Sequence, residues 1–171
     1  WTALISGYAR ITDAKRVLVL FHQMIAEGTM PDSVTFTVVL TVCSHASLVK
    51  EGQMYFDAMK HVYGLTPTIE HYTCLVDLFS RVGCFDKAIV IIESILPHRD
   101  RVEMWVALLG GCGQWANVDL GKWAFEQSVP LNDTYAATYV YMSNIYAAAG
   151  MQEKSGIKAL RLKTRDMPDV I

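Results

Sequence analysis

The chain has little charge of either sign and no long apolar run. Only 19% of its 171 residues are charged, and the formal net charge is −2. Proteins held to nucleic acid mainly through phosphates usually carry a basic face, so we expect weak nucleic-acid affinity from this chain alone. No apolar run approaches the roughly 18 residues that a membrane span needs, so no membrane partner is expected. The 52% hydrophobic content instead predicts a folded, extensively buried chain.

The chain also lacks the motifs of a metal site or a catalytic centre. Its four cysteines form no C-x-x-C pair, and no histidine lies at ligand spacing from them: Cys43, Cys74, Cys84 and Cys112. We interpret them as buried thiols in a reducing compartment. The five histidines are scattered, and no nucleophile with a nearby base can be inferred from them. We therefore expect neither a cofactor nor an enzymatic activity.

An aromatic residue instead recurs along the chain at steps of 35, 36, 33 and 34 residues: Trp1, Phe36, Tyr72, Trp105 and Tyr139. A period in this range is typical of stacked structural repeats. The residues three and seven positions after each aromatic are mostly apolar, and these offsets share one helical face. The residue sixteen positions after is small in four of the five copies: Gly52, Ala88, Gly121 and Ser155. A small residue there would let the second helix of a repeat approach the first closely.

These patterns predict an all-α fold, an α-solenoid of about five stacked antiparallel helix-turn-helix repeats. One helix pair cannot bury its apolar seam alone, so neighbouring pairs must stack. We number the repeats one to five, with the boundaries 1–32, 33–68, 69–100, 101–134 and 135–168. The chain begins inside a repeat, which suggests a piece of a longer protein.

Capping residues and glycines predict where the helices begin and end. Asp13 and Asn117 can cap second helices, Ser33 and Thr35 can cap the first helix of repeat two, and Asp86 opens the second helix of repeat three. Gly28, Gly64, Gly83 and Gly150 mark helix ends or turns. The glycine-rich stretch 110–113 is interpreted as a turn. No strand precedes it and no Gly-Lys-Ser/Thr follows, so a helix end with close packing is favoured there over a phosphate-binding loop. A basic helix is expected over about 152–164.

Several of these stretches resemble one known family. Residues 1–10 and 27–32 are similar to a pentatricopeptide repeat. Residues 34–56 resemble the long L-type repeat of its plant organellar PLS subclass, and residues 69–78 resemble the short S-type repeat. Residues 105–109 with 117–121 are similar to the first E motif of the C-terminal extension, and residues 139–147 are similar to the second.

This resemblance implies that the α-solenoid is right-handed. It also implies binding of single-stranded organellar RNA, one nucleotide per repeat, in factors that direct the editing of cytidine to uridine. Specificity in the family resides in the fifth and last residues of each repeat. With Trp1 as the fourth position, these residues form three pairs here: Thr2 with Asp32, Thr37 with Thr68, and Thr73 with Asp100. Val34 and Glu70 fall where side chains flank the base. Thr with Asp favours guanine in this family, so repeats one and three would each prefer guanine.

Residue chemistry agrees with base reading but also permits a simpler interpretation. A threonine hydroxyl can donate and accept a hydrogen bond, whereas an ionised aspartate only accepts. Single-stranded RNA exposes base edges that such a pair can contact. The same residue types also suit helix starts, however, and Asp32 and Asp100 can cap the helices that follow them.

The resemblance also implies partners. The His-x-Glu and Cys-x-x-Cys pattern of a zinc deaminase is absent, so the chain is expected to be non-catalytic. The E motifs lack base-reading pairs and would instead contact a deaminase domain, in cis or in trans, or small organellar editing cofactors. The localisation would be mitochondrion or chloroplast. The alternative is a protein-interaction platform with little RNA affinity. Exposed solenoid ends also predict self-association, through the Trp1 end or the last helix.

Overall fold

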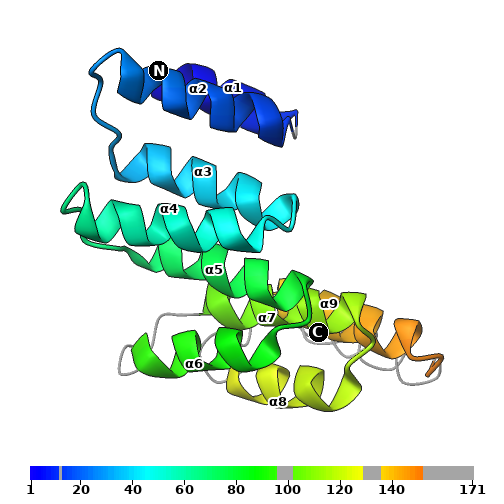
Figure 1. The fold of residues 1–171 in the computed structure, drawn as a ribbon. Helices are drawn as coiled ribbons and strands as arrows, with labels where there is room; N and C mark the ends of the chain where they lie inside the picture. The colour runs from blue at the N-terminus through cyan, green and yellow to red at the C-terminus, as the bar shows by residue number, and fades with distance from the viewer. Residues whose placement is uncertain (12, 96–101, 129–135, 152–171) are drawn as a thin grey trace, which may run out of the picture. The chain divides into compact units, whose positions relative to one another are not determined.

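The computed structural model describes residues 1–11, 13–95, 102–128 and 136–151, and these ranges contain helices and no strand (Figure 1). The nine helices in them are α1 (Thr2–Arg10), α2 (Ala14–Ala26), α3 (Ser33–His45), α4 (Val49–His61), α5 (Ile69–Arg81), α6 (Phe85–Ile95), α7 (Val102–Gln114), α8 (Val118–Ser128) and α9 (Ala136–Ala148). The all-α prediction is confirmed. The helix expected over 152–164 lies outside the described residues.

The chain forms two compact bodies, Trp1–Val82 with α1 to α5 and Gly83–Ile171 with α6 to α9. Each body is described separately below. In the part of the chain that the structure covers, no helix is long and apolar enough to cross a membrane.

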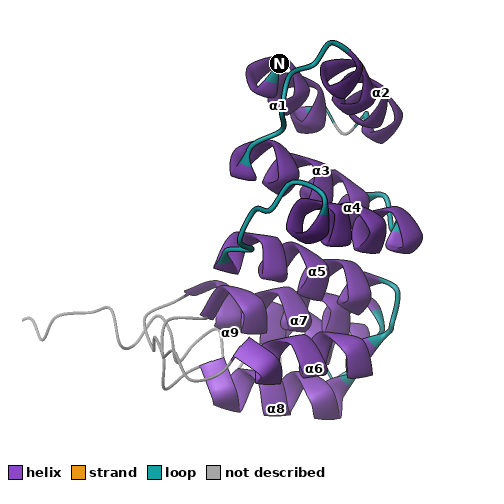
Figure 2. Ribbon diagram, turned by 60° about the vertical axis from the view of Figure 1, so that its left-hand side comes forward, coloured by secondary structure: helices purple, strands orange, loops and turns teal. Residues whose placement is uncertain are grey.

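In the N-terminal body, each second helix packs between the first helix of its own repeat and the first helix of the next. Helix α2 contacts α1 and α3, and α4 contacts α3 and α5. Figure 2 shows the resulting levels, with α1 and α2 above α3 and α4, followed by α5. The rings of Phe21, Phe36 and Tyr55 meet edge to face at the centre of this body. The first helices α1, α3 and α5 consequently lie side by side.

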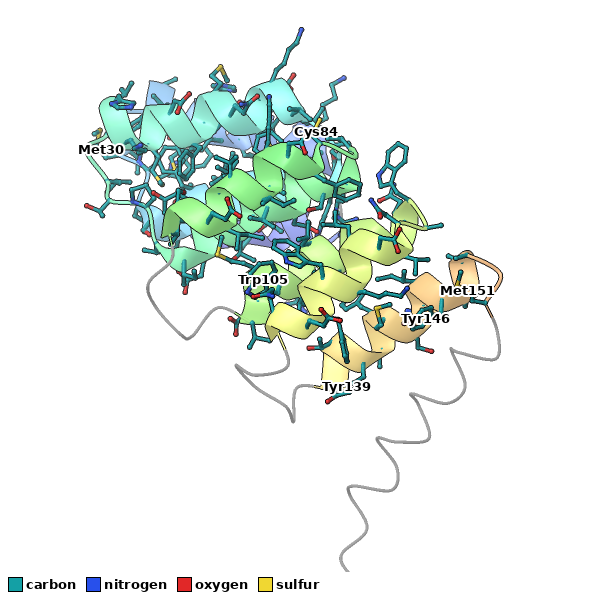
Figure 3. The ribbon with its side chains drawn as sticks, turned by 90° about the horizontal axis from the view of Figure 1, so that it is seen from below. Met30, Cys84, Trp105, Tyr139, Tyr146 and Met151 are labelled. Carbon is teal, nitrogen blue, oxygen red and sulfur yellow. The ribbon has the colours of Figure 1, made fainter. Side chains whose placement is uncertain are left out.

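The C-terminal body repeats this arrangement. Helix α8 packs against both α7 and α9, α7 also packs against α9, and α6 packs against α7. Trp105 of α7 meets Trp123 of α8 edge to face, and Phe125 of α8 meets Tyr139 of α9 in the same way. Figure 3 labels Trp105 on α7, and Tyr139 and Tyr146 on α9. The aromatic period therefore marks residues at the contacts between helices.

The glycines sixteen positions after an aromatic are needed chiefly because the first helix of the next repeat packs closely against them. A Cβ on Gly52 would lie 2.5 Å from Leu78 Cδ2 of α5 and 3.4 Å from Cys43 Cβ of α3. A Cβ on Gly121 would lie 2.8 Å from Ile145 Cδ1 of α9. The prediction of close packing at these glycines is confirmed, but the closest neighbour lies on the first helix of the following repeat.

The apolar seam is buried except at the chain's first helix. At the third offset, Val39, Leu75, Leu108 and Met142 are buried, whereas Leu4 is 50% exposed. Among the described helices α1 contacts only α2 and α3, and neither covers Leu4. Leu4 thus belongs to an exposed apolar end.

The predicted caps agree with the structure at two positions and differ at a third. Asp13 accepts from the Arg16 amide at 3.0 Å, and Asn117 accepts from the Leu120 amide at 3.2 Å. Helix α3 is capped by Asp32, not by Ser33 or Thr35, because its carboxylate reaches the Thr35 amide at 2.7 Å. The interpretation of Asp32 as a cap for the next helix is therefore confirmed.

The turn predicted over residues 110–113 is wrong, because these residues lie near the end of α7, but the close packing favoured for this stretch is confirmed. The glycines here allow α9 to pack closely against α7. A Cβ on Gly110 would lie 3.5 Å from the Tyr141 ring, and one on Gly113 would lie 3.8 Å from Ile145 Cγ1. The chain turns later, at Ala116, whose φ is 51°.

The prediction of buried thiols holds for only some of the cysteines. Cys43 and Cys112 are buried and Cys74 is half-buried, but Cys84 is exposed between α5 and α6. All four are free thiols. No group of three histidine, cysteine or acidic side chains within the described ranges could hold a metal ion.

Candidate nucleic-acid interface

The three predicted base-reading threonines lie near the N-terminal ends of adjacent helices. Thr2 is the first residue of α1, and Thr37 and Thr73 are the fifth residues of α3 and α5. Hydrogen bonds join these ends, from Thr2 to Thr35 at 2.9 Å and between Thr37 and His71 at 3.2 Å. The threonines therefore form a row across one edge of the N-terminal body.

The first pair, Thr2 and Asp32, is brought together through Thr35. The Thr35 hydroxyl donates to Asp32 Oδ1 at 2.7 Å and is also hydrogen-bonded to the Thr2 hydroxyl at 2.9 Å. The Thr35 side chain is fully buried, whereas Asp32 is exposed. Residues 30 positions apart in the sequence thus form one hydrogen-bonded triad.

Asp32 is ionised in this triad. The hydrogen bond from the Thr35 side chain, followed by the one from the Thr35 amide, lowers the pKa of Asp32 below its ordinary value. An ionised carboxylate only accepts hydrogen bonds. The exposed end of this side chain therefore suits a ligand that donates hydrogen bonds.

The second pair, Thr37 and Thr68, is linked by the fully buried His71, with a different pattern of hydrogen bonds. The Thr68 amide donates to His71 Nδ1 at 3.0 Å, so this nitrogen must accept. The opposite nitrogen, Nε2, then carries the hydrogen and donates to the Ser33 carbonyl at 2.9 Å. Nε2 lies 3.2 Å from the Thr37 hydroxyl, and Nδ1 lies 2.9 Å from the Thr68 hydroxyl. His71 also completes a capping box with Thr68 at the start of α5.

The two residues expected to flank a base are exposed beside this row. Val34 is 58% exposed, and Glu70 is also exposed. Glu70 accepts a hydrogen bond from the Thr68 hydroxyl, which lowers the pKa of Glu70. Val34 can therefore offer apolar contact, while Glu70 adds a negative charge near the row.

The third pair is described only at Thr73. Its hydroxyl donates to the Ile69 carbonyl one turn earlier in α5, at 2.8 Å. Asp100 lies outside the described residues, so its position relative to Thr73 stays a prediction.

Sequence reasoning missed the linking roles of Thr35 and His71. Each directly precedes the aromatic of its repeat, and this shared position is the signal that could have revealed them. Thr138 holds the same position before Tyr139 and is buried, yet its hydroxyl has no hydrogen-bond partner within the described residues. The fifth residues of repeats four and five are Val106 and Val140, which cannot form the polar pair.

Comparison with known proteins gives this geometry a family. Residues 1–45 match the model of the PPR repeat family, and residues 34–62 and 70–96 match the model of the PPR repeat itself. The chain belongs to the PPR repeat family. A chloroplastic pentatricopeptide repeat-containing protein of Arabidopsis thaliana is 39% identical to it over 167 residues, which cover 98% of this chain and 20% of that relative. The PPR chain thus spans about a fifth of the relative's length.

Solved PPR structures share its fold. The crystal structure of PPR10 from maize aligns with a TM-score of 0.62 at 23% identity, covering 99% of this chain and 25% of that one. PPR10 in complex with an 18-nt psaJ RNA element aligns with a TM-score of 0.62 at 18% identity, covering 98% of this chain and 28% of that one. The fold of this PPR chain is therefore a solenoid of helical repeats.

Proposed function

We propose that this PPR chain recognises single-stranded organellar RNA, reading one base per repeat at the row formed by Thr2, Thr37 and Thr73. The observation that carries the proposal is the repeated linkage of a fifth residue to a last residue, through Thr35 in one repeat and His71 in the next. Two hydrogen-bonded groups of different composition at the edges of adjacent helices offer polar atoms one repeat apart. Such a spacing suits successive bases of an extended strand.

The first pair offers the chemistry to select guanine. The guanine base edge carries two neighbouring donors, and the ionised Asp32 beside the Thr2 oxygen offers acceptors. The same residue types in repeat three, Thr73 and Asp100, extend this preference to a second guanine, separated from the first by one nucleotide. The solved complex of PPR10 with RNA supports RNA as the ligand class.

The second part of the proposal is a role in cytidine-to-uridine editing in the mitochondrion or chloroplast. Repeats four and five carry Val106 and Val140 where base-reading residues would stand, which supports a different use for them. In this account they are the E motifs that place a deaminase domain, in cis or in trans, or that bind small editing cofactors. This chain contributes RNA selection and partner placement and no catalytic step. The relative named chloroplastic supports an organellar setting.

Fluorescence anisotropy with short labelled RNAs tests the proposal. One RNA carries guanosine at two places separated by one nucleotide, and its controls carry adenosine or uridine at those places. At low salt we expect the guanosine RNA to bind about tenfold more tightly than the adenosine and uridine controls, which is the discrimination that at least one good base contact provides. All affinities should fall as salt rises.

Two variants make this experiment specific. Thr73→Asn should reduce the preference for guanosine, because an amide adds donors where the base also donates. Thr66→Asn makes the same change in the exposed segment between α4 and α5 and should leave the preference intact. Binding that is indifferent to the two bases would contradict base reading.

A second candidate function is a protein-interaction platform with little RNA affinity of its own. The net charge of −2 and the lowered pKa values of Asp32 and Glu70, which keep both carboxylates charged beside the row, favour it. Exposed apolar side chains in the C-terminal body, among them Val90 and Val140, offer a surface for such a partner. Tight binding of a deaminase domain together with no measurable RNA binding would support this alternative.

A further inference from the structure

We propose that Thr35 is a positioning residue that orients the hydroxyl of Thr2 and thereby determines which base repeat one selects. The inference deepens the proposed function and rests on it. Thr35 belongs to repeat two and lies outside the fifth-and-last pair of repeat one. Its role follows from the direction of the hydrogen bonds in the triad.

The hydrogens in this triad can be assigned one by one. A threonine hydroxyl has a single hydrogen. Thr35 uses its hydrogen to donate to Asp32 Oδ1 at 2.7 Å, because the ionised carboxylate has no hydrogen to donate. In the 2.9 Å contact between the two threonines, Thr2 must therefore be the donor. The only hydrogen of the Thr2 hydroxyl is thus directed to Thr35.

This assignment leaves repeat one with acceptors alone. The Thr2 oxygen offers a lone pair to a ligand, and the Asp32 carboxylate accepts as well. Among the four RNA bases, only guanine presents two neighbouring donors on its Watson–Crick edge, the N1 hydrogen and the N2 amino group. Adenine, cytosine and uracil each place an acceptor beside a donor there. A Thr2 hydroxyl free to rotate could donate to such an acceptor, but one bound to Thr35 cannot.

The surroundings of Thr35 keep this orientation. Its side chain is fully buried, and its amide donates to the same Asp32 oxygen at 2.7 Å. The amide contact does not depend on the side chain, so Asp32 stays in place when only the hydroxyl of Thr35 is removed. For the pair of repeat two, His71 of repeat three holds the equivalent position, so the orienting group differs there.

Substitutions at Thr35 test the inference. Thr35→Val removes the hydroxyl at nearly constant shape, and Thr35→Ser retains it. Thr41→Val makes the same change at another position of α3, where the hydroxyl donates to the Thr37 carbonyl and contacts Cys74 instead of Thr2 and Asp32. Each full-length variant is measured by anisotropy with the RNA carrying two guanosines, and with RNAs in which inosine or adenosine replaces one guanosine at a time. The guanosine that responds to Thr2→Val is the one read by repeat one.

We expect the unaltered chain to favour guanosine over inosine and adenosine at this place by about tenfold. Inosine lacks the N2 amino group and so provides only one of the two donors. In Thr35→Val the preference over adenosine should shrink to about twofold, because the freed Thr2 hydroxyl can donate to adenine N1. Thr35→Ser and Thr41→Val should keep the preference of the unaltered chain. Circular dichroism should show unchanged helical content in all three.

The outcomes separate this inference from the proposed function. A Thr35→Val variant that still prefers guanosine over adenosine by about tenfold would overturn the inference and leave base reading standing. The same conclusion would follow if Thr35→Ser lost the preference as Thr35→Val does. An unaltered chain that binds guanosine, inosine and adenosine RNAs equally would overturn the proposed function and this inference with it.

Discussion

At the scale of single residues, Asp32 serves both the fold and the candidate interface. Its Oδ1 accepts from the amide and the hydroxyl of Thr35, which begins α3 and links Asp32 to Thr2. The cap of α3 and the proposed base-reading residue are thus one side chain. Changes at this position must be analysed for stability before they are interpreted as effects on RNA.

Replacing Asp32 by alanine should destabilise the chain by about 1 kcal/mol at pH 7, the usual contribution of a helix cap. The pKa of Asp32 is lowered in the folded state, so its stabilisation is present above the ordinary aspartate pKa and is lost as the pH falls through the lowered value. Urea unfolding at pH 7 and near pH 2 should show the difference between Asp32→Ala and the unaltered chain shrinking in acid. Asp32→Asn is the control, because asparagine caps nearly as well. A difference that does not depend on pH would contradict this account of Asp32.

The cysteines should differ strongly in reactivity. Burial raises the pKa of Cys43 and of Cys112 to about 12, so at pH 8 only about one thiol in ten thousand is ionised at either site. With a thiol-specific reagent, exposed Cys84 should be labelled first and these two last. Mass spectrometry of timed samples measures the order. In denaturant all four should react at similar rates, and early labelling of Cys43 in the folded chain would contradict the packing described.

At the scale of the helices, the sequence predicts elements better than links between them. The period of the aromatics and the small sixteenth residues correctly predicted an all-α fold, because burial of one helix face imposes a regular pattern on the sequence. For the stretch 110–113 the predicted turn is wrong and the favoured close packing is confirmed, because glycine is common both at turns and where helices approach closely. Only the packing of Gly110 and Gly113 against α9 distinguishes the two.

The candidate interface was predictable only in part, for a related reason. The family pattern identifies Thr2 and Asp32 as a pair, and in the structure both are hydrogen-bonded to Thr35. It does not identify Thr35 or His71, because a polar residue before an aromatic looks like an ordinary helix-start residue. Their roles are visible only in the structure, where each contacts a threonine of the preceding repeat.

Two glycines in helices should respond in opposite directions to alanine. A methyl at Gly52 would lie 2.5 Å from Leu78, which is buried, so Gly52→Ala should destabilise by about 1 kcal/mol after its gain in helix propensity is subtracted. Gly7 has no atom within 4 Å of such a methyl, so Gly7→Ala should stabilise by about 0.5–1 kcal/mol. Thermal unfolding of the two variants measures both. Equal effects of the same sign would show that helix packing at Gly52 is looser than described.

At the scale of the whole molecule, we expect self-association through the exposed end of the first repeat. Leu4 and Ile11 of this end are 50% and 68% exposed, and an uncovered solenoid end tends to associate. Sedimentation velocity over a range of concentrations should show a dimer that Leu4→Lys weakens. Met54→Lys, at an exposed position on α4, is the matched control and should leave the dimer intact. A purely monomeric profile at high concentration would contradict self-association.

The central claim is that the row of helix ends reads bases, and selection from a random RNA pool tests it most directly. The unaltered chain is mixed with short random RNAs, and the bound fraction is sequenced. The account predicts enrichment of two guanosines separated by one nucleotide, and loss of only one of them in the double variant Thr2→Ala with Asp32→Ala. No enrichment, or an enrichment that the double variant leaves unchanged, would contradict base reading at this row.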